Sequence, residues 1–194
     1  MKIILTLSLL LSFISRIVAQ EAGFSNNSIK TGLGIGIHQG KQEKGMGFMM
    51  SVGYQKTLKN SRIRINPDFM SGTFGSGLML HTRDQYYRLS SAGINGYIDA
   101  LKYQGLSLCV GTGVSLNYAR GLLGTGGGKE FSARSSEYFY SLYYAGNLTA
   151  GLRINSPHKR LAYTLTPVDI HIGNKLYLLG MWKFDIEIKL KAHK

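Results

Sequence analysis

The chain has 194 residues, a length that suits one domain, and 23 Lys and Arg against 10 Asp and Glu give it a formal net charge of +13. A single cysteine, Cys109, excludes an internal disulfide framework and is expected to be a small filler in mid-strand. The 25 glycines and 12 tyrosines are high for a globular enzyme, and they fit a tightly curved sheet with aromatic side chains at an interface.

The N-terminus has the pattern of a targeting segment. A lysine precedes an apolar run over 3–14, and Ala19 offers a small residue for cleavage. We therefore expect 1–19 to be a signal peptide and 20–29 to be a short N-terminal segment. The alternative, a membrane anchor, is disfavoured because a serine and an arginine interrupt the apolar run. An exported chain meets no nucleic acid, so its positive charge points to outer-membrane lipid and lipopolysaccharide, or to a solvated surface.

Downstream of residue 20, no run approaches the roughly 18 apolar residues of a transmembrane helix. Short segments instead alternate between apolar and small or polar residues, as when Leu33, Ile35 and Ile37 alternate with glycines. A period of two indicates β-strands, because successive side chains leave a strand on opposite faces. The eight predicted strands are 30–38, 46–56, 62–69, 87–100, 106–118, 138–154, 161–170 and 180–190.

The fourth predicted strand is the least regular. Tyr87 and Leu89 are in one phase of the alternation, whereas Ala92 and Ile94 are in the other. A change of phase within one strand predicts a β-bulge, here near 90–91.

The closing strand, 180–190, alternates without a slip between an apolar and a charged face. A membrane barrel would turn the apolar face to lipid and the charged face to the lumen, whereas a soluble barrel would turn the apolar face to a core. The apolar residues are Trp182, Phe184, Ile186, Ile188 and Leu190, and the charged residues are Lys183, Asp185, Glu187 and Lys189.

The connections between these strands differ in length. We expect short turns at 58–60, 102–105 and 155–160, and longer loops at 39–45, 70–86, 120–137 and 171–179. Pro67 and Pro167 are expected to mark strand ends, because proline cannot donate to a ladder. The alternation of short turns with longer loops predicts an all-β fold over 30–190, an eight-stranded antiparallel up-and-down transmembrane β-barrel followed by a tail at 191–194.

Aromatic and basic residues support the membrane barrel over a soluble one. The short turns carry several lysines and a histidine, and the aromatic residues of the apolar face gather toward the strand ends, as in interfacial girdles. The predicted girdle residues are Phe48, Tyr54, Tyr97, Tyr118, Tyr140, Tyr163 and Trp182.

With this hairpin rhythm and this closing strand, the chain resembles the small eight-stranded outer-membrane β-barrel families of the OmpX or OmpA membrane-domain type, over roughly 28–190. Such families end in an alternating strand whose last residue is aromatic; here Leu190 stands in that place and 191–194 continues beyond it. The resemblance implies the fold and a place in the bacterial outer membrane, and implies no activity.

No catalytic, cofactor or metal site is predicted. The five histidines lack the spacing of a metal pair, and the GxG fragments at 34–36 and 111–113 lie inside strands, where no phosphate loop forms. A lipid A-modifying enzyme, a deacylase or acyltransferase, is the first alternative: it would use His38 or His171 with a nearby serine such as Ser71, Ser76 or Ser90 at the outer rim. A secreted soluble barrel that binds an apolar ligand is the second.

The strongest constellation is a set of charged side chains that the alternation places inside the barrel. Buried charges need partners, and inward glycines at 32, 34, 36 and 53 leave room for them. We predict a lumen plugged by ion pairs in a non-enzymatic envelope protein with a structural, adhesive or partner-binding role and no cofactor. The predicted network is Arg62, Arg64, Asp99, Arg153, Lys183, Asp185, Glu187 and Lys189.

Overall fold

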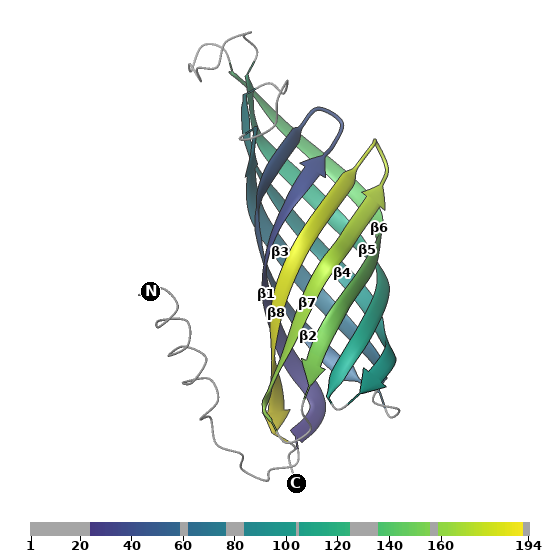
Figure 1. Cartoon of the computed structure of the whole chain (residues 1–194). Helices are drawn as coiled ribbons and strands as arrows, with labels where there is room; N and C mark the ends of the chain where they lie inside the picture. Colours follow the sequence, from purple (N-terminus) through teal and green to yellow (C-terminus); the bar gives the residue numbers. More distant parts are fainter. Residues whose placement is uncertain are drawn as a thin grey trace, which may run out of the picture.

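Eight antiparallel strands close into a single barrel in the computed structural model (Figure 1). The structure describes residues 24–58, 62–76, 84–103, 105–124, 136–155 and 159–191. The expected signal peptide at 1–19 lies outside these residues, and so does the expected tail at 191–194 except for Lys191, which ends β8. The strands are β1 (Phe24–Gln39), β2 (Lys44–Thr57), β3 (Ile63–Gly75), β4 (Gln85–Tyr103), β5 (Leu106–Gly124), β6 (Ser136–Asn155), β7 (Leu161–Gly173) and β8 (Leu178–Lys191).

The barrel is closed by pairing between its first and last strands. Gly32 of β1 lies opposite Ser51 of β2 on one side and Asp185 of β8 on the other. Every other strand pairs with its neighbours in the chain, so the topology is up-and-down, as the sequence predicted. Closure leaves no open sheet edge around the body of the barrel. In the described part of the chain, no helix is long and apolar enough to cross a bilayer.

We call the end with the connections 40–43, 76–84, 125–135 and 174–177 the loop end, and the opposite end, where β1 begins and β8 ends, the turn end. The strands reach further toward the loop end than predicted. The expected loops 39–45 and 171–179 shrink to tight connections, and β3 to β6 take up parts of 70–86 and 120–137. Figure 1 shows β5 and β6 rising beyond the other strands at the loop end.

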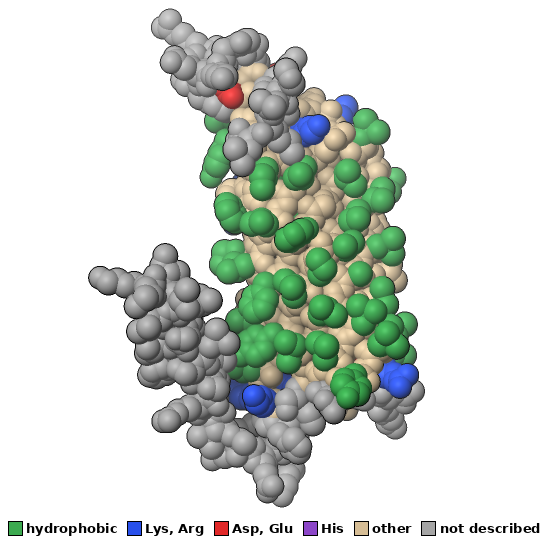
Figure 2. All heavy atoms as spheres, viewed as in Figure 1, with side chains coloured by type: hydrophobic (Ala, Val, Ile, Leu, Met, Phe, Trp, Pro, Cys, Tyr) green, Lys and Arg blue, Asp and Glu red, His purple; other side chains and the backbone are tan. Residues whose placement is uncertain are grey.

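The two faces of the wall have opposite chemistry. Leu33, Val114 and Leu148 are each at least 60% exposed on the outside, whereas their strand neighbours point inward. Figure 2 shows hydrophobic side chains over the height of the visible wall, with lysine and arginine confined to its two ends. The apolar face is therefore the outer one, which is the arrangement of a membrane barrel and the reverse of what a soluble apolar-ligand barrel requires.

The expected bulge in the fourth strand is wrong. β4 keeps an unbroken register with β3 and β5 through 90–91, and its shift lies at Asp99/Leu101. Tyr87 and Leu89 are buried because they face the lumen, in phase with the rest of the strand. Tyr97 is also buried inside, so its assignment to the aromatic girdle is wrong as well.

The two prolines lie inside strands and do not end them. The β2–β3 ladder opens beside Pro67, where Asn66 Nδ2 donates to the carbonyl of Tyr54 at 3.0 Å. At Pro167 the β7–β8 register shifts between Thr166 and Asp169. Each proline is tolerated because a local irregularity removes the need for its missing donor.

Candidate functional site

The lumen at the turn end holds a chain of alternating charges. Arg64 Nη2 contacts Asp99 Oδ1 at 2.6 Å, and Arg153 Nη1 lies 3.6 Å from Asp99 Oδ2. Arg153 also donates to Glu187 Oε2 from Nη2 at 2.7 Å and from Nε at 3.2 Å. Ser28 donates to the other Glu187 oxygen at 2.8 Å. Two arginines and two carboxylates from four strands thus balance one another, which is the condition for burying charge.

A second ion pair lies beside Gly32, on the side of these charges that is nearer the loop end. Lys30 Nζ of β1 lies 3.0 Å from Asp185 Oδ2 of β8. The room for the carboxylate comes from Gly32, since a Cβ there would lie 2.0 Å from Asp185 Oδ1 and 2.8 Å from Ser51 Oγ.

The middle of the lumen holds a third cluster around Asp169. Lys183 Nζ lies 3.2 Å from Asp169 Oδ2, and His171 Nε2 lies 3.2 Å from Asp169 Oδ1. On its other side His171 Nδ1 lies 3.4 Å from Ser115 Oγ, which accepts a hydrogen bond from Asn117 at 3.0 Å. This is a serine, a histidine and a carboxylate in line, buried inside the barrel.

Amides complete the middle of the lumen. Asn95 donates to Asp68 Oδ1 at 3.0 Å, and Asn147 donates to Asn95 Oδ1 at 2.5 Å. They link β3, β4 and β6 across the lumen, so its middle is crossed by side-chain bonds.

The loop end of the lumen is aromatic. His38 Nδ1 and the Tyr87 hydroxyl are 2.9 Å apart, and Tyr143 donates to Glu43 Oε1 at 2.6 Å. The Tyr177 ring packs 5.0 Å from the His38 ring and 4.9 Å from the Tyr143 ring. Burial, with Tyr143 and Glu43 nearby, raises the pKa of the Tyr177 phenol well above its ordinary value, so it stays protonated.

Apolar side chains fill the space around these rings, and together they form what we call the aromatic cap. The inner face was expected to carry small or charged residues almost throughout, so the cap corrects that view. Its other buried members are Met49, Met70, Phe74, Leu89, Ala119, Leu123, Phe139, Ala145, Leu179 and Met181.

The predicted network residues fall into two groups. Six of them lie in the lumen and engage in ion pairs: Arg64, Asp99, Arg153, Lys183, Asp185 and Glu187. Lys189 also faces inward, and it donates to the carbonyl of Lys159 at the turn end. Arg62 does not belong to the network, because it precedes β3 and is exposed. Among the predicted girdle residues, Phe48, Tyr54, Tyr118, Tyr140 and Trp182 are exposed on the outer face, and Tyr163 is half-buried.

Several buried or half-buried ionisable groups were missed, among them Lys30, Glu43, Asp68, Asp169 and His171. Asp68 and Asp169 follow prolines that were taken as strand ends. The alternation continues past Pro67, whereas at Pro167 it slips by one residue and then resumes. His38 and His171, expected at the outer rim, are both buried in the lumen, whereas Ser71 and Ser90 contact each other on the outer face.

Comparison with solved structures agrees with this architecture. The neisserial surface protein A (NspA) matches with a TM-score of 0.59 at 13% identity, over 87% of this chain and 99% of that one. The attachment invasion locus protein Ail of Yersinia pestis matches with a TM-score of 0.53 at 15% identity, over 84% of this chain and 97% of that one. The chain has the fold of a small outer-membrane β-barrel.

Sequence comparison adds no further relative. No protein-family model matches the chain, and no curated protein sequence is significantly similar. Ail has also been solved in complex with the heparin analogue sucrose octasulfate.

Within the described residues, no group of His, Cys, Asp and Glu could hold a metal ion.

Proposed function

We propose that the protein is a non-enzymatic barrel of the bacterial outer membrane, exported through a cleaved signal peptide, with a partner-binding or adhesive role at the cell surface. The apolar outer face and the solved structures of the same fold support this location. In this orientation the loop end faces the outside of the cell, and the turn end with both termini faces the periplasm.

An open strand edge at the loop end carries the proposal. Pairing between β6 and β7 begins at Ala145, opposite Gly173, whereas pairing between β6 and β5 continues to Ser136. In the described part of the chain, Ser136 to Leu142 therefore pair on one side only. Lys175 Nζ contacts the Leu142 carbonyl at 3.3 Å and covers part of this edge.

The open edge suits an extended partner segment. The carbonyls of Leu142 and Tyr144 point toward the β7 side, so by alternation the N–H and C=O of Tyr140 point there too. Tyr138 and Tyr140 are 59% and 71% exposed on the outer face beside it. Backbone groups of an exposed edge give affinity to an added strand, and neighbouring side chains give selectivity.

A proline at Tyr140 tests this proposal. It should remove the N–H of the open edge and leave the ladder to β5 intact, whereas Tyr140→Ala keeps the N–H and removes the ring. Bacteria that display the barrel would be counted on cell monolayers, matrix proteins and immobilised heparin, the last because Ail binds a heparin analogue. We expect several-fold more adhesion than with empty vector, and its loss in Tyr140→Pro.

Equal adhesion of vector control and barrel would overturn the proposed role. If Tyr140→Pro and Tyr140→Ala both adhered like wild type, the partner would not use the β6 edge. Heat-dependent migration on gels would establish that each variant folds as a barrel.

The lumen is proposed to be closed and to have no transport role. Ion pairs span its turn end and middle, and the aromatic cap fills its loop end. An eight-stranded barrel is only wide enough for its own side chains, so these contacts leave little space for a path.

Enzyme activity is disfavoured even though Ser115, His171 and Asp169 lie in line. All three side chains are buried among lumen residues, and Asp169 also pairs with Lys183. The neighbouring strand amides are engaged in the ladder, so none is free to stabilise an oxyanion. The cluster is better explained as part of the buried polar network.

A further inference from the structure

We propose that Arg88 and Arg120 bind the phosphate of an acylated glycolipid in the outer leaflet, whose acyl chain lies in an apolar groove directly below them. Arg88 of β4 and Arg120 of β5 are direct cross-strand partners, and both are exposed on the outer face. Like charges placed opposite each other destabilise a sheet. Neither guanidinium forms an ion pair with a carboxylate of the described residues. An anion from outside the chain would remove this repulsion.

The surroundings of the arginine pair fit a phosphate. Arg88 Nε donates to Ser71 Oγ at 3.1 Å, and Ser71 Oγ lies 3.4 Å from Ser90 Oγ. The Arg88 guanidinium is therefore partly fixed in orientation, while its two Nη groups have no hydrogen bond to a described residue. Guanidinium groups bind phosphate oxygens through paired N–H groups, which favours this anion over a point-charge partner.

The depth of the pair in the membrane also fits a headgroup. Arg120 lies opposite Tyr140, and Ser90 lies opposite Tyr118 in the next row. Exposed tyrosines mark the level of lipid headgroups, because their rings combine an apolar body with a polar tip. Below this level the outer face becomes apolar, beginning with Ala92 and Leu116.

A groove of about 570 Å³ begins in that apolar region, between β4, β5 and β6. Small outward residues, Ala92 and Gly146, make it hollow, and Ile94, Leu116 and Tyr144 form its sides. It lies two rows below the arginine pair in the strand register. A ligand with a phosphate above and a hydrocarbon chain below would contact both parts, and in an outer leaflet that describes a phosphorylated glycolipid.

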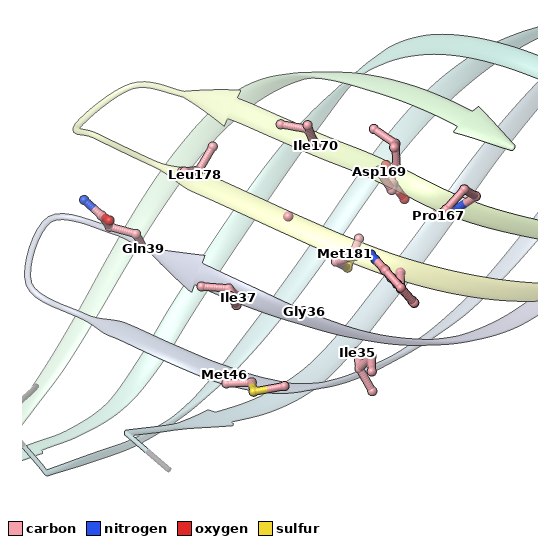
Figure 3. Close-up of a pocket in the computed structure, with 13 residues that line it drawn as sticks. Ile35, Gly36, Ile37, Gln39, Met46, Pro167, Asp169, Ile170, Leu178 and Met181 are labelled. Atoms are coloured by element: carbon pink, nitrogen blue, oxygen red, sulfur yellow. The ribbon is translucent and has the colours of Figure 1, made fainter. Parts of the chain in front are cut away.

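A second hollow on the wall provides a comparison. Figure 3 shows the groove between β1, β7 and β8, which Ile37, Ile170 and Leu178 line. In the strand register, Gly180 lies opposite both Ile37 and Ile170. No arginine lines it, so it has the apolar half of the proposed site and lacks the charged half. The inference rests on the proposed outer-membrane location but not on the β6 edge.

The experiment measures binding of bisphosphorylated, acylated lipid A to the folded full barrel in detergent micelles, by native mass spectrometry. In Arg88→Gln/Arg120→Gln we expect the apparent Kd to rise about 10-fold or more, since losing one charge-assisted contact costs about a factor of ten. The control Lys41→Gln/Lys44→Gln removes the same charge elsewhere at the loop end and should change Kd less than about 2-fold by this reasoning.

The groove is tested by a matched pair of substitutions. Gly146→Leu fills the proposed groove and should weaken lipid A binding, whereas Gly180→Leu fills the groove of Figure 3 and should not. A Cβ at Gly146 would meet only the Gly113 carbonyl at 3.9 Å, so the barrel should fold. Ala92→Leu serves the same purpose if Gly146→Leu does not assemble.

Several results would overturn the proposal. Equal losses in the arginine and lysine variants would show only diffuse charge attraction. Competition by inorganic phosphate or by a deacylated phosphosugar at the lipid's own concentration would show an anion site without a groove. Heparin binding that depends on Arg88 and Arg120, with lipid A binding unchanged, would assign the pair to a sulfated polysaccharide.

Discussion

Gly32 leaves the room in the lumen that the side chain of Asp185, its partner on β8, occupies. Its missing Cβ leaves the space in which Asp185 meets Lys30, and a β-carbon would overlap the carboxylate. The glycine is therefore needed for close approach, and backbone conformation does not explain it. Without this glycine Asp185 could not lie beside Lys30, and an unpaired buried carboxylate would be costly.

We expect Gly32→Ala to destabilise the barrel by about 1–3 kcal/mol, the usual cost of overpacking. Urea unfolding in vesicles, followed by the fluorescence of the single tryptophan, Trp182, would measure it. Gly180→Ala is the control, since a Cβ there meets nothing within 4 Å. Similar stability of the two variants would contradict the close approach.

Glu187→Ala should remove the partner that holds Arg153 most closely. Arg153 would keep only Asp99, at 3.6 Å and shared with Arg64, so a buried guanidinium would be left largely unpaired. The expected loss is about 3–5 kcal/mol if the site is dry, and less if water reaches it. Urea titrations of Glu187→Ala and the isosteric Glu187→Gln would measure it. Wild-type stability in Glu187→Ala would rule out a dry network.

At the scale of the strand, most of the correct predictions came from the alternation of apolar with small or polar residues. It placed Arg64, Asp185 and Glu187 on the inner face, because side chains alternate between the two faces along the whole of a regular strand. It failed where a strand ending was inferred from one residue, as at Pro67 and Pro167. A proline shows that one donor is missing, but whether a bulge or a side-chain amide compensates depends on neighbouring strands.

The aromatic cap could not be predicted for a related reason. Phe74, Tyr177 and Leu179 lie in segments that were expected to be loops, and Tyr87 pointed to a bulge only because an aromatic residue was assumed to face outward. Which face receives an aromatic side chain near a strand end depends on the register across the closed barrel. That register is not present in one strand's pattern.

A charge on the outward face of a strand should be costly, whereas a conservative polar change on the inward face should be tolerated. Val110→Arg or Leu148→Arg places a cation on the apolar face near mid-strand and should cost about 2–4 kcal/mol or prevent assembly. Ser107→Thr is the control on the inward face, where the polar group is retained. Assembly would be followed by heat-dependent gel migration, and tolerance of both arginines would contradict a lipid-facing wall.

At the scale of the whole molecule, the proposed orientation makes the loop end accessible from outside. Trypsin added to intact cells should cut the connection between β5 and β6, which contains Lys129 and Arg134. The connection between β6 and β7, with Lys159 and Arg160, should be cut only after the membrane is opened. Mass spectrometry of the fragments distinguishes the two, and the opposite pattern would invert the topology.

The last prediction concerns the lumen, which we propose to be closed by two different barriers. The ion pairs from Arg64 to Glu187 cross the turn end, and the cap around Tyr87, Tyr143 and Tyr177 fills the loop end. An ion would have to separate buried pairs and then pass a region that offers few ligands, so single-channel recordings of the wild-type barrel should show no steady current.

The two barriers can be separated by substitution. Tyr87→Ala/Tyr143→Ala opens the cap alone, and we expect it to remain closed because the charged layers below are intact. Combining it with Arg153→Ala/Glu187→Ala, which removes a matched pair of opposite charges, should produce measurable conductance if the barrel still folds. A steady current through the wild-type barrel would show that water already connects the two ends. Conductance in the cap variant alone would mean that the ion pairs are wet and mobile.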